Sequence, residues 1–200
     1  MAKYKKQLRT WLDANKPFSA AEIRAAGIPS QILVELCAKG EIERLCRGVY
    51  ISSKAQSSSE LSLQIAMLKM PQSIVCLLSA LRFHNFTTQL PHDVWLAVKP
   101  HSWIPKNDEL PLRIVTFLEA SYSYGVEEHE VDGIKIKVYS AAKTVADCFK
   151  CRNKIGLDVA MEALREGYRL KLFTVSELMK AAKVCRVTNV ITPYMESLLE

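Results

Sequence analysis

The sequence lacks the long apolar run of a membrane-spanning helix and the glycine-rich signatures of common nucleotide and hydrolase sites. None of G-x-x-x-x-G-K-[ST], G-x-G-x-x-G or G-x-S-x-G occurs in its 200 residues. No signal peptide opens it, because MAKYKKQL passes from basic residues directly into an amphipathic stretch. These absences argue against a membrane protein and a secreted protein, and they predict a cytoplasmic chain with reduced thiols.

Metal-binding and redox motifs are also scarce. Cys148 and Cys151 form a lone C-x-x-C, and no second pair stands at zinc-site spacing. Both cysteines fall late in an expected helix, whereas a redox motif begins one, so we expect them to pack in the core. His84, beside Phe83 and Phe86, is expected to be packed and hydrogen-bonded. The sequence therefore predicts no cofactor and no metal.

Residues 19–51 carry the clearest structural pattern. Ser19 and Glu22 have the S-x-x-E spacing of a capping box, which marks a helix start. Gly27 ends that helix, and Pro29 fits the first turn of a second helix, where its missing N–H does no harm. Two helices joined by a short turn are expected here.

The second helix has an apolar and a more polar face. Its apolar face holds Ile32, Leu33, Leu36 and Cys37. Its opposite face holds Gln31, Val34, Glu35 and Ala38. Gly40 stops the helix, and residues 42–51 alternate as two short strands around Arg47 and Gly48. Helix, turn, helix and hairpin predict a winged helix-turn-helix with residues 29–39 as its recognition helix.

The positive charge is concentrated in the same part of the chain. The formal net charge is +6, of which residues 1–55 carry +5 and the remaining residues +1. This placement favours a polyanionic partner, and with the order of elements it predicts double-stranded DNA. A solvated basic surface is the alternative.

DNA contacts are expected from the first helix, the recognition helix and the hairpin. The basic face of residues 3–14 can contact phosphates. Gln31 can pair with adenine, Ser30 suits a phosphate or a base, and Glu35 is tolerable where it accepts from a cytosine amine. Gly48 supplies a tight-turn conformation. The predicted DNA-binding residues are Lys5, Lys6, Ser30, Gln31, Arg44, Arg47, Gly48 and Tyr50.

A polar, serine-rich linker at residues 54–59 predicts a boundary between domains 1–55 and 56–200. Asp132 and Gly133 give the strongest hairpin-turn signal of the second domain. Further elements are expected at residues 61–68, 74–78, 79–84, 94–98, 113–118, 128–131, 134–139, 140–152, 156–167, 174–182 and 190–199. The fold class is α+β, an N-terminal winged helix-turn-helix followed by a mixed, mostly antiparallel sheet with C-terminal helices.

Three segments resemble antitoxins of the AbiE abortive-infection type. They are RGVY at residues 47–50, SALRFHNFTTQLP at residues 79–91 and YSAAKTVADCFKCRNKIGLDVAMEALREGY at residues 139–168. The resemblance implies a transcriptional regulator of a type IV toxin–antitoxin pair, used in phage defence. By this resemblance, its winged helix is expected to repress its own operon at promoter repeats, and its C-terminal domain to neutralise a nucleotidyltransferase-like toxin without a stable complex.

Position by position, the resemblance places the wing at Arg44, Arg47, Gly48 and Tyr50. It places the polar positions of the antitoxin domain at Ser79, His84, Thr87, Thr88, Ser140, Lys143, Thr144, Asp147, Arg152 and Asp158. The family often has Arg rather than Lys near position 143. A lysine binds anions as a point charge, without the bidentate geometry of a guanidinium.

Lys143, Thr144 and Asp147 share one face of the helix that Ser140 caps. They could form a polar platform for an acidic ligand or nucleotide at the helix N-terminus. The alternative is an ordinary capped helix with a Lys143–Asp147 pair on its surface.

Two other functions remain open. A stand-alone winged-helix transcription factor needs no toxin partner. A metal-dependent nuclease needs acidic residues beside a lysine on sheet edges, for which Asp93, Glu128, Glu130 and Asp132 are the candidates. Such charges more often keep a sheet edge soluble, so we expect no enzyme.

Overall fold

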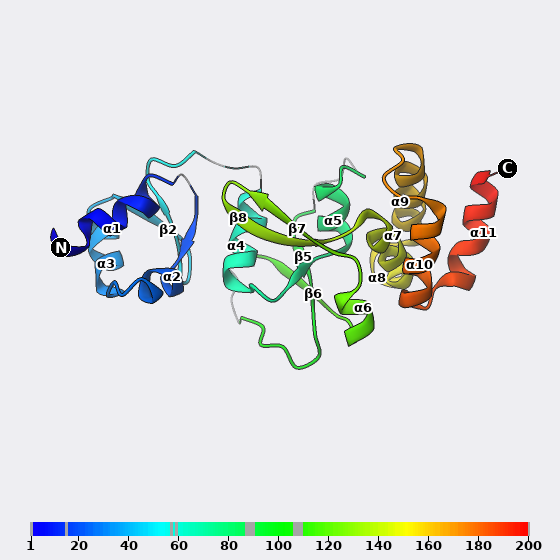
Figure 1. Cartoon of the computed structure of the whole chain (residues 1–200), viewed down its shortest axis with the longest axis horizontal. Coiled ribbons are helices and arrows are strands. Elements are labelled where there is room, and N and C mark those ends of the chain that lie inside the picture. The colour runs from blue at the N-terminus through cyan, green and yellow to red at the C-terminus, as the bar shows by residue number, and fades with distance from the viewer. Residues whose placement is uncertain are drawn as a thin grey trace. The chain divides into compact units, whose positions relative to one another are not determined.

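The computed structural model describes residues 2–14, 16–56, 58, 60–86, 91–105 and 110–199, and for residues 2, 3, 5, 6 and 199 only the backbone (Figure 1). The chain divides into two compact units. The first unit comprises Met1–Gln72, Ile104–Leu110 and His129–Ile136; the second comprises Ser73–Trp103, Pro111–Glu128 and Lys137–Glu200. The separation into domains 1–55 and 56–200 stays a prediction, because compactness alone does not show that either part folds and acts independently.

The first unit begins with three helices and a small antiparallel sheet, which Figure 1 shows gathered together. Its elements are α1 (Ala2–Leu12), β1 (Phe18–Ser19), α2 (Ala20–Ala25), α3 (Gln31–Ala38), β2 (Ile42–Cys46), β3 (Val49–Ser52) and α4 (Leu61–Lys69). The strands lie in the order β1-β3-β2. Helix, helix and hairpin therefore follow one another in the expected order.

Local signals in the sequence explain where these elements begin and turn. The capping box of α2 is formed: the Ser19 backbone N–H donates to Glu22 Oε2 at 2.6 Å, and the Glu22 N–H donates to Ser19 Oγ at 3.2 Å. Gly48 adopts φ +82° in the turn between β2 and β3, a conformation that favours glycine. One buried cluster holds the three helices on the sheet: Leu8, Phe18, Ile23, Ile28, Ile32, Leu33, Leu36 and Ile42.

The larger sheet has five strands, β4 (Ile74–Val75), β5 (Val94–Val98), β6 (Leu112–Thr116), β7 (Val126–Val131) and β8 (Ile134–Tyr139). Their order is β6-β5-β4-β8-β7. β4 pairs antiparallel with β5, but β5 with β6 and β4 with β8 are parallel. The sheet is mixed, as expected, but the prediction that it is mostly antiparallel was wrong. The long connections between β5 and β6 and between β4 and β8 let a strand return in the same direction.

Helices make up most of the second unit. They are α5 (Leu77–Phe83), α6 (Glu119–Ser123), α7 (Ala141–Lys150), α8 (Arg152–Ile155), α9 (Leu157–Arg169), α10 (Val175–Cys185) and α11 (Thr188–Leu199). α7 packs against α5, α8, α9, α10 and α11. Every residue from Ala141 to Phe149 is buried, so α7 is the central helix of this unit.

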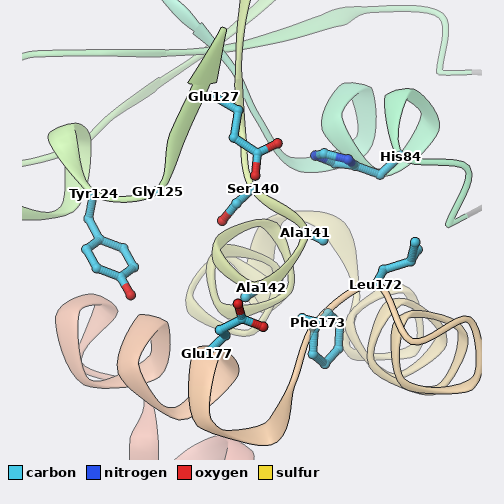
Figure 2. A pocket seen from close by; sticks show the side chains of 10 residues that line it. All are labelled: His84, Tyr124, Gly125, Glu127, Ser140, Ala141, Ala142, Leu172, Phe173 and Glu177. Carbon is cyan, nitrogen blue, oxygen red and sulfur yellow. The ribbon is translucent and has the colours of Figure 1, made fainter. Parts of the chain in front are cut away.

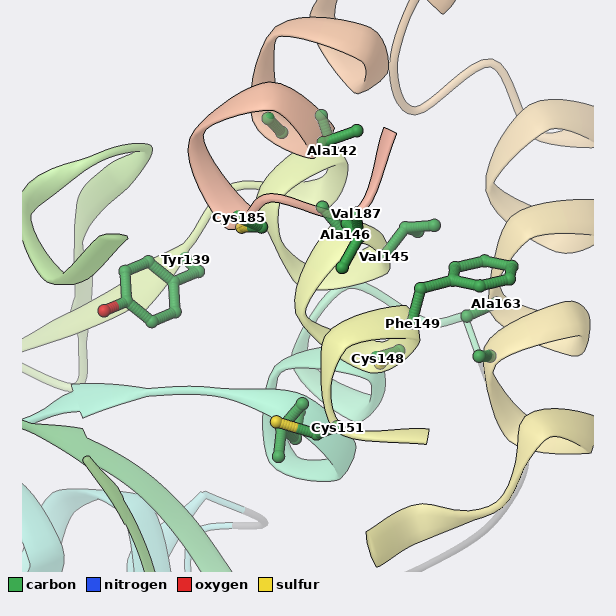
Figure 3. Close-up of a cluster of buried hydrophobic side chains, with 14 of the residues drawn as sticks. Tyr139, Ala142, Val145, Ala146, Cys148, Phe149, Cys151, Ala163, Cys185 and Val187 are labelled. Atoms are coloured by element: carbon green, nitrogen blue, oxygen red, sulfur yellow. The ribbon is translucent and has the colours of Figure 1, made fainter. Parts of the chain in front are cut away.

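The cysteines of the C-x-x-C motif are part of this core. Cys148 and Cys151 are buried free thiols, as predicted, and lie on α7 and at its end (Figure 3). In the same view, the ring of Phe149 points toward α9, where Ala163 lies.

Within the described residues, no helix combines the length and apolar character needed to cross a membrane.

Candidate nucleic-acid interface and buried polar cluster

The two faces of α3 differ as the sequence predicts. Ile32, Leu33 and Leu36 are buried in the cluster of the first unit. Gln31, Val34 and Ala38 are exposed on the opposite face, and Val34 has 60% of its surface exposed. Because positions i, i+3 and i+7 share one side of a helix, these three side chains form a continuous outer face.

The β2–β3 hairpin presents arginines to solvent. Arg44 and Arg47 are exposed, and Arg44 Nε donates to the carbonyl oxygen of Cys46 at 3.4 Å. Tyr50 is half-buried, and its ring stacks on Phe18 with centroids 6.2 Å apart. Tyr50 therefore fixes the hairpin on β1, a packing role that its position in the sequence did not reveal.

The remaining predicted DNA contacts are distributed over the first unit. Ser30 is half-buried immediately before α3 and makes no side-chain cap. Lys5 and Lys6 belong to α1, but their side chains lie outside the described part of the chain. Arg9, on the basic face of α1 that the sequence offers to phosphates, is exposed, and so is Arg24 of α2, which the sequence did not single out as a contact.

Lys143 and Asp147 are both fully buried and form an ion pair, with Lys143 Nζ 2.5 Å from Asp147 Oδ2. The ammonium also lies over the rings of Tyr139, at 4.0 Å, and Phe117, at 4.8 Å. The interpretation that placed this pair on the helix surface was wrong, and the alternative of a platform open to an acidic ligand is not supported, because neither side chain is exposed. The i, i+4 spacing sets which side chains meet but not how deep they lie, and helices pack around α7.

Burial sets the protonation behaviour around this pair. Desolvation raises the pKa of the Asp147 carboxyl, while the Lys143 ammonium opposes the shift. The Cys185 thiol donates to Asp147 Oδ1 at 3.3 Å, and desolvation raises the pKa of that thiol to about 12. Cys185 is therefore a buried, protonated partner of the carboxylate rather than a reactive thiolate.

Several other polar positions of the resemblance also make internal hydrogen bonds. The carbonyl oxygen of Tyr139 accepts from Thr144 Oγ1 at 3.1 Å and lies 2.6 Å from His84 Nε2. Ser140 Oγ accepts from the Lys143 N–H, which confirms Ser140 as the cap of α7. The remaining contacts are Ser79 Oγ accepting from the Trp95 N–H and Arg152 Nη1 donating to the carbonyl oxygen of Phe149. Thr87 and Thr88 lie outside the described residues, and Asp158 is exposed on α9.

A pocket of about 440 Å³ opens beside the start of α7 (Figure 2). Its charged lining consists of the carboxylates of Glu127 and Glu177, with the His84 ring nearby; no lysine or arginine is among the described lining residues. Glu177 is also the capping-box partner of Thr174 at the start of α10. With Lys143 buried and two carboxylates at the rim, this pocket is a poor site for an acidic ligand.

Two of the four acidic candidates of the nuclease alternative, Asp93 and Asp132, have structural partners, while Glu128 and Glu130 are exposed on β7. Asp93 Oδ2 accepts from Arg113 Nε at 2.6 Å, and this hydrogen bond lowers the pKa of the Asp93 carboxyl. Asp132 Oδ2 accepts from Ser58 Oγ at 2.8 Å and from Gln64 Nε2 at 3.0 Å. Within the described ranges, no three His, Cys, Asp or Glu residues are grouped so that they could hold a metal ion.

Comparison with known proteins gives one family and no curated relative. Residues 6–52 match the family described as transcriptional regulator, AbiEi antitoxin. This match runs from α1 to the end of β3 and therefore covers α3 and the hairpin. No curated protein matches the chain. Over residues 6–52, the resemblance of this chain to AbiE-type antitoxins is thus confirmed.

Proposed function

We propose that this protein is a DNA-binding repressor of its own promoter. The observation that carries the proposal is the outer face of α3, which is exposed while the opposite face anchors the helix in the core. The first unit acts as a winged helix: α3 enters the major groove, and the β2–β3 hairpin is the wing that contacts the backbone. The family match over residues 6–52 supports a regulator and antitoxin role.

The charges of the first unit fit this docking. Residues 1–55 carry a net charge of +5. Arg44 and Arg47 are exposed on the wing, and neither the sequence nor the structure suggests a base-reading role for them. They contact phosphates, so they contribute affinity and salt dependence, while α3 supplies sequence preference.

We further propose that the protein is the antitoxin of a type IV pair and acts in the cytoplasm. It neutralises a nucleotidyltransferase-like toxin through residues 56–200, without a stable complex. The support is the resemblance of residues 79–91 and 139–168 to AbiE-type antitoxins. No catalytic role is proposed, because Asp93 and Asp132 already have structural partners. The alternative is a stand-alone regulator without a toxin partner. A test of toxin neutralisation distinguishes it from this proposal.

The promoter test uses the full chain and the double variant Arg44→Ala, Arg47→Ala. Binding to the DNA upstream of its own gene is measured by fluorescence anisotropy from about 50 to 200 mM salt, because each phosphate contact releases a condensed counterion. We expect the variant to bind at least about tenfold more weakly at moderate salt. We also expect its slope of log K against log[salt] to be shallower by about 2.

The matched control removes two exposed cations from the second unit, Arg165→Ala and Lys180→Ala, with the same loss of net charge. This control should bind the promoter like the wild-type protein. Equal salt slopes for wild type and the hairpin variant would remove the wing assignment. Failure of the wild-type chain to bind duplex DNA would remove the proposed function.

A further inference from the structure

We propose that α3 reads A·T base pairs, with Val34 packed against the C5-methyl group of a thymine and Gln31 paired with an adenine. This inference rests on the proposed function, because it assigns the base preference of the same DNA-binding face. It concerns two side chains of α3 that point outward while Ile32, Leu33 and Leu36 hold the helix in place.

Val34 is unusual among the outward residues of α3. It is the one large apolar side chain of α3 that is exposed, at 60%, among neighbours that are polar or small. An exposed valine side chain contributes little hydrophobic stabilisation, because most of its apolar surface stays in water, and valine has a lower helix propensity than most residues. Its side chain is stiff at χ1, so its methyl groups are held in one direction without a further entropy loss on binding. A methyl group in a major groove, which only thymine offers, is the partner that this geometry fits.

The rest of the outer face favours the same base pairs. Gln31 lies one turn before Val34, at the N-terminal end of α3 that recognition helices direct toward base edges. Glutamine pairs with adenine through N6 and N7, whereas guanine is read by arginine or lysine. All residues of α3, Gln31–Ala38, are described, and none of them is a lysine or an arginine. Ala38 is small, so it lets the helix approach the base edges closely.

Glu35 is the one residue of the outer face that points to a different base. It can accept from the amine of cytosine, but it is half-buried, whereas Gln31 and Val34 are exposed. Around the helix axis, Glu35 and Val34 lie on opposite sides of Gln31. We therefore expect Glu35 to influence the edge of a site at most, and the centre of each half-site to be A·T.

The test first identifies a site and then removes single methyl groups from it. Full-length protein is used to enrich duplexes from a random DNA pool, and the enriched duplex becomes the probe. Each thymine in it is replaced, one at a time, by uracil, which lacks only the C5-methyl. Dissociation constants are measured for the wild-type protein and for Val34→Ala, which should fold normally because alanine is the better helix former at this exposed position.

We expect the enriched sites to share A·T pairs. At one thymine per half-site, replacement by uracil should weaken wild-type binding about fourfold, the effect of one buried methyl group. Val34→Ala should bind the thymine and uracil duplexes equally. Glu35→Ala, the matched control on the same helix, should keep the thymine preference. The thymine-to-uracil ratio should not change with salt, because a methyl contact releases no counterions.

The outcomes separate the two proposals. If no duplex is enriched, DNA binding itself is refuted. If duplexes are enriched but their shared positions are G·C, or uracil binds as well as thymine, DNA binding stands and the role of Val34 is refuted. The same holds if Val34→Ala keeps the preference for thymine.

Discussion

Lys143 is a fully buried lysine whose ammonium meets one carboxylate, that of Asp147, and the faces of the Tyr139 and Phe117 rings. A buried pair of this kind adds little net stability compared with apolar residues, but removing one partner leaves the other charge unpaired. The polar character of α7 is therefore an internal feature of the fold. This explains why Lys143 is not available to a ligand in the pocket beside it.

Lys143→Met keeps an apolar stem against the two rings but leaves Asp147 without its cation. We expect the free energy of unfolding at pH 7 to fall by about 3–5 kcal/mol, the usual effect of breaking a buried pair. The double variant Lys143→Met, Asp147→Leu should recover most of the loss, because no buried charge remains. Urea unfolding followed by circular dichroism measures both. As a surface control, Arg169→Met breaks the exposed pair with Glu166 and should leave stability nearly unchanged.

The same variant should show a characteristic pH dependence. Burial raises the pKa of Asp147, and Lys143 is the strongest group that lowers it. Without Lys143 the folded state keeps its proton at pH values where the unfolded chain has released it. Stability of Lys143→Met should therefore fall as pH rises above the ordinary aspartate pKa of about 3.9, so the deficit is smaller at pH 5 than at pH 7. A deficit that grows on acidification would contradict the assignment to Asp147.

The burial of Lys143 shows what could be read from the sequence at single positions. The partners were predictable, because Lys143 and Asp147 stand at i, i+4 and Ser140 precedes the helix. The burial of the pair was not predicted, although the sequence contains a sign of it: between residues 141 and 149 only Lys143, Thr144 and Asp147 are polar. A helix that is apolar on nearly all sides belongs in a core, so its few polar residues are expected to bond with one another.

Among whole elements, the glycine turns show how sequence fixes local structure. Gly48, in the β2–β3 turn, and Gly125, where α6 leads into β7, adopt φ +82° and +66°. A Cβ at Gly48 would meet no atom within 4 Å, whereas one at Gly125 would lie 2.9 Å from Lys143 Cβ and 3.0 Å from Ser140 Oγ. The two positions share the backbone strain and differ in steric contact.

Gly48→Ala and Gly125→Ala therefore form a matched pair. The left-handed backbone should reduce the free energy of unfolding by about 1–2 kcal/mol in Gly48→Ala. Gly125→Ala should lose at least about 1 kcal/mol more, because its methyl group would push against α7 in the packed core. Urea unfolding of both variants gives the comparison. Equal losses would mean that α7 yields to the added methyl group.

Local elements were more predictable than their arrangement. The capping box at Ser19 and Glu22, the glycine turns and the Asp132–Gly133 hairpin gave α2, α3 and the hairpins at nearly their observed positions. A second capping box, Thr174 with Glu177, has the same spacing and marks the start of α10 in the same way. These signals act over a few residues, so one sequence suffices to read them.

At the scale of the molecule, strand direction and order could not be read. β4 has two residues and lies between β5 and β8, which come much later in the chain. Which strands pair depends on how the helices pack on the sheet. A short apolar segment such as residues 74–75 does not indicate which strands will lie beside it. The sequence therefore predicted a mixed sheet but did not identify which of its strands are parallel to one another.

The proposed division of labour also belongs to the whole molecule. Promoter binding uses the exposed wing, and neutralisation uses residues 56–200, so a variant that loses one activity should keep the other. We expect the full chain with Arg44→Ala and Arg47→Ala to lose repression of a promoter reporter. The same variant should still restore growth when co-expressed, from an unrelated promoter, with a nucleotidyltransferase-like toxin encoded next to its gene.

One control and one further variant make this test decisive. The control is that protein levels are matched by immunoblot. The further variant is Lys143→Met, which has an intact wing but a destabilised second unit, so growth rescue should be weakened more than promoter repression. The wing variant could fail to restore growth even when its protein level equals that of the wild type. That result would mean that neutralisation requires DNA binding and that the two activities are not separable. If the wild-type chain represses but never restores growth, the protein is a stand-alone regulator. A toxin that co-elutes with the full chain in size-exclusion chromatography would instead show neutralisation through a stable complex, because indirect antagonism leaves the two proteins unbound.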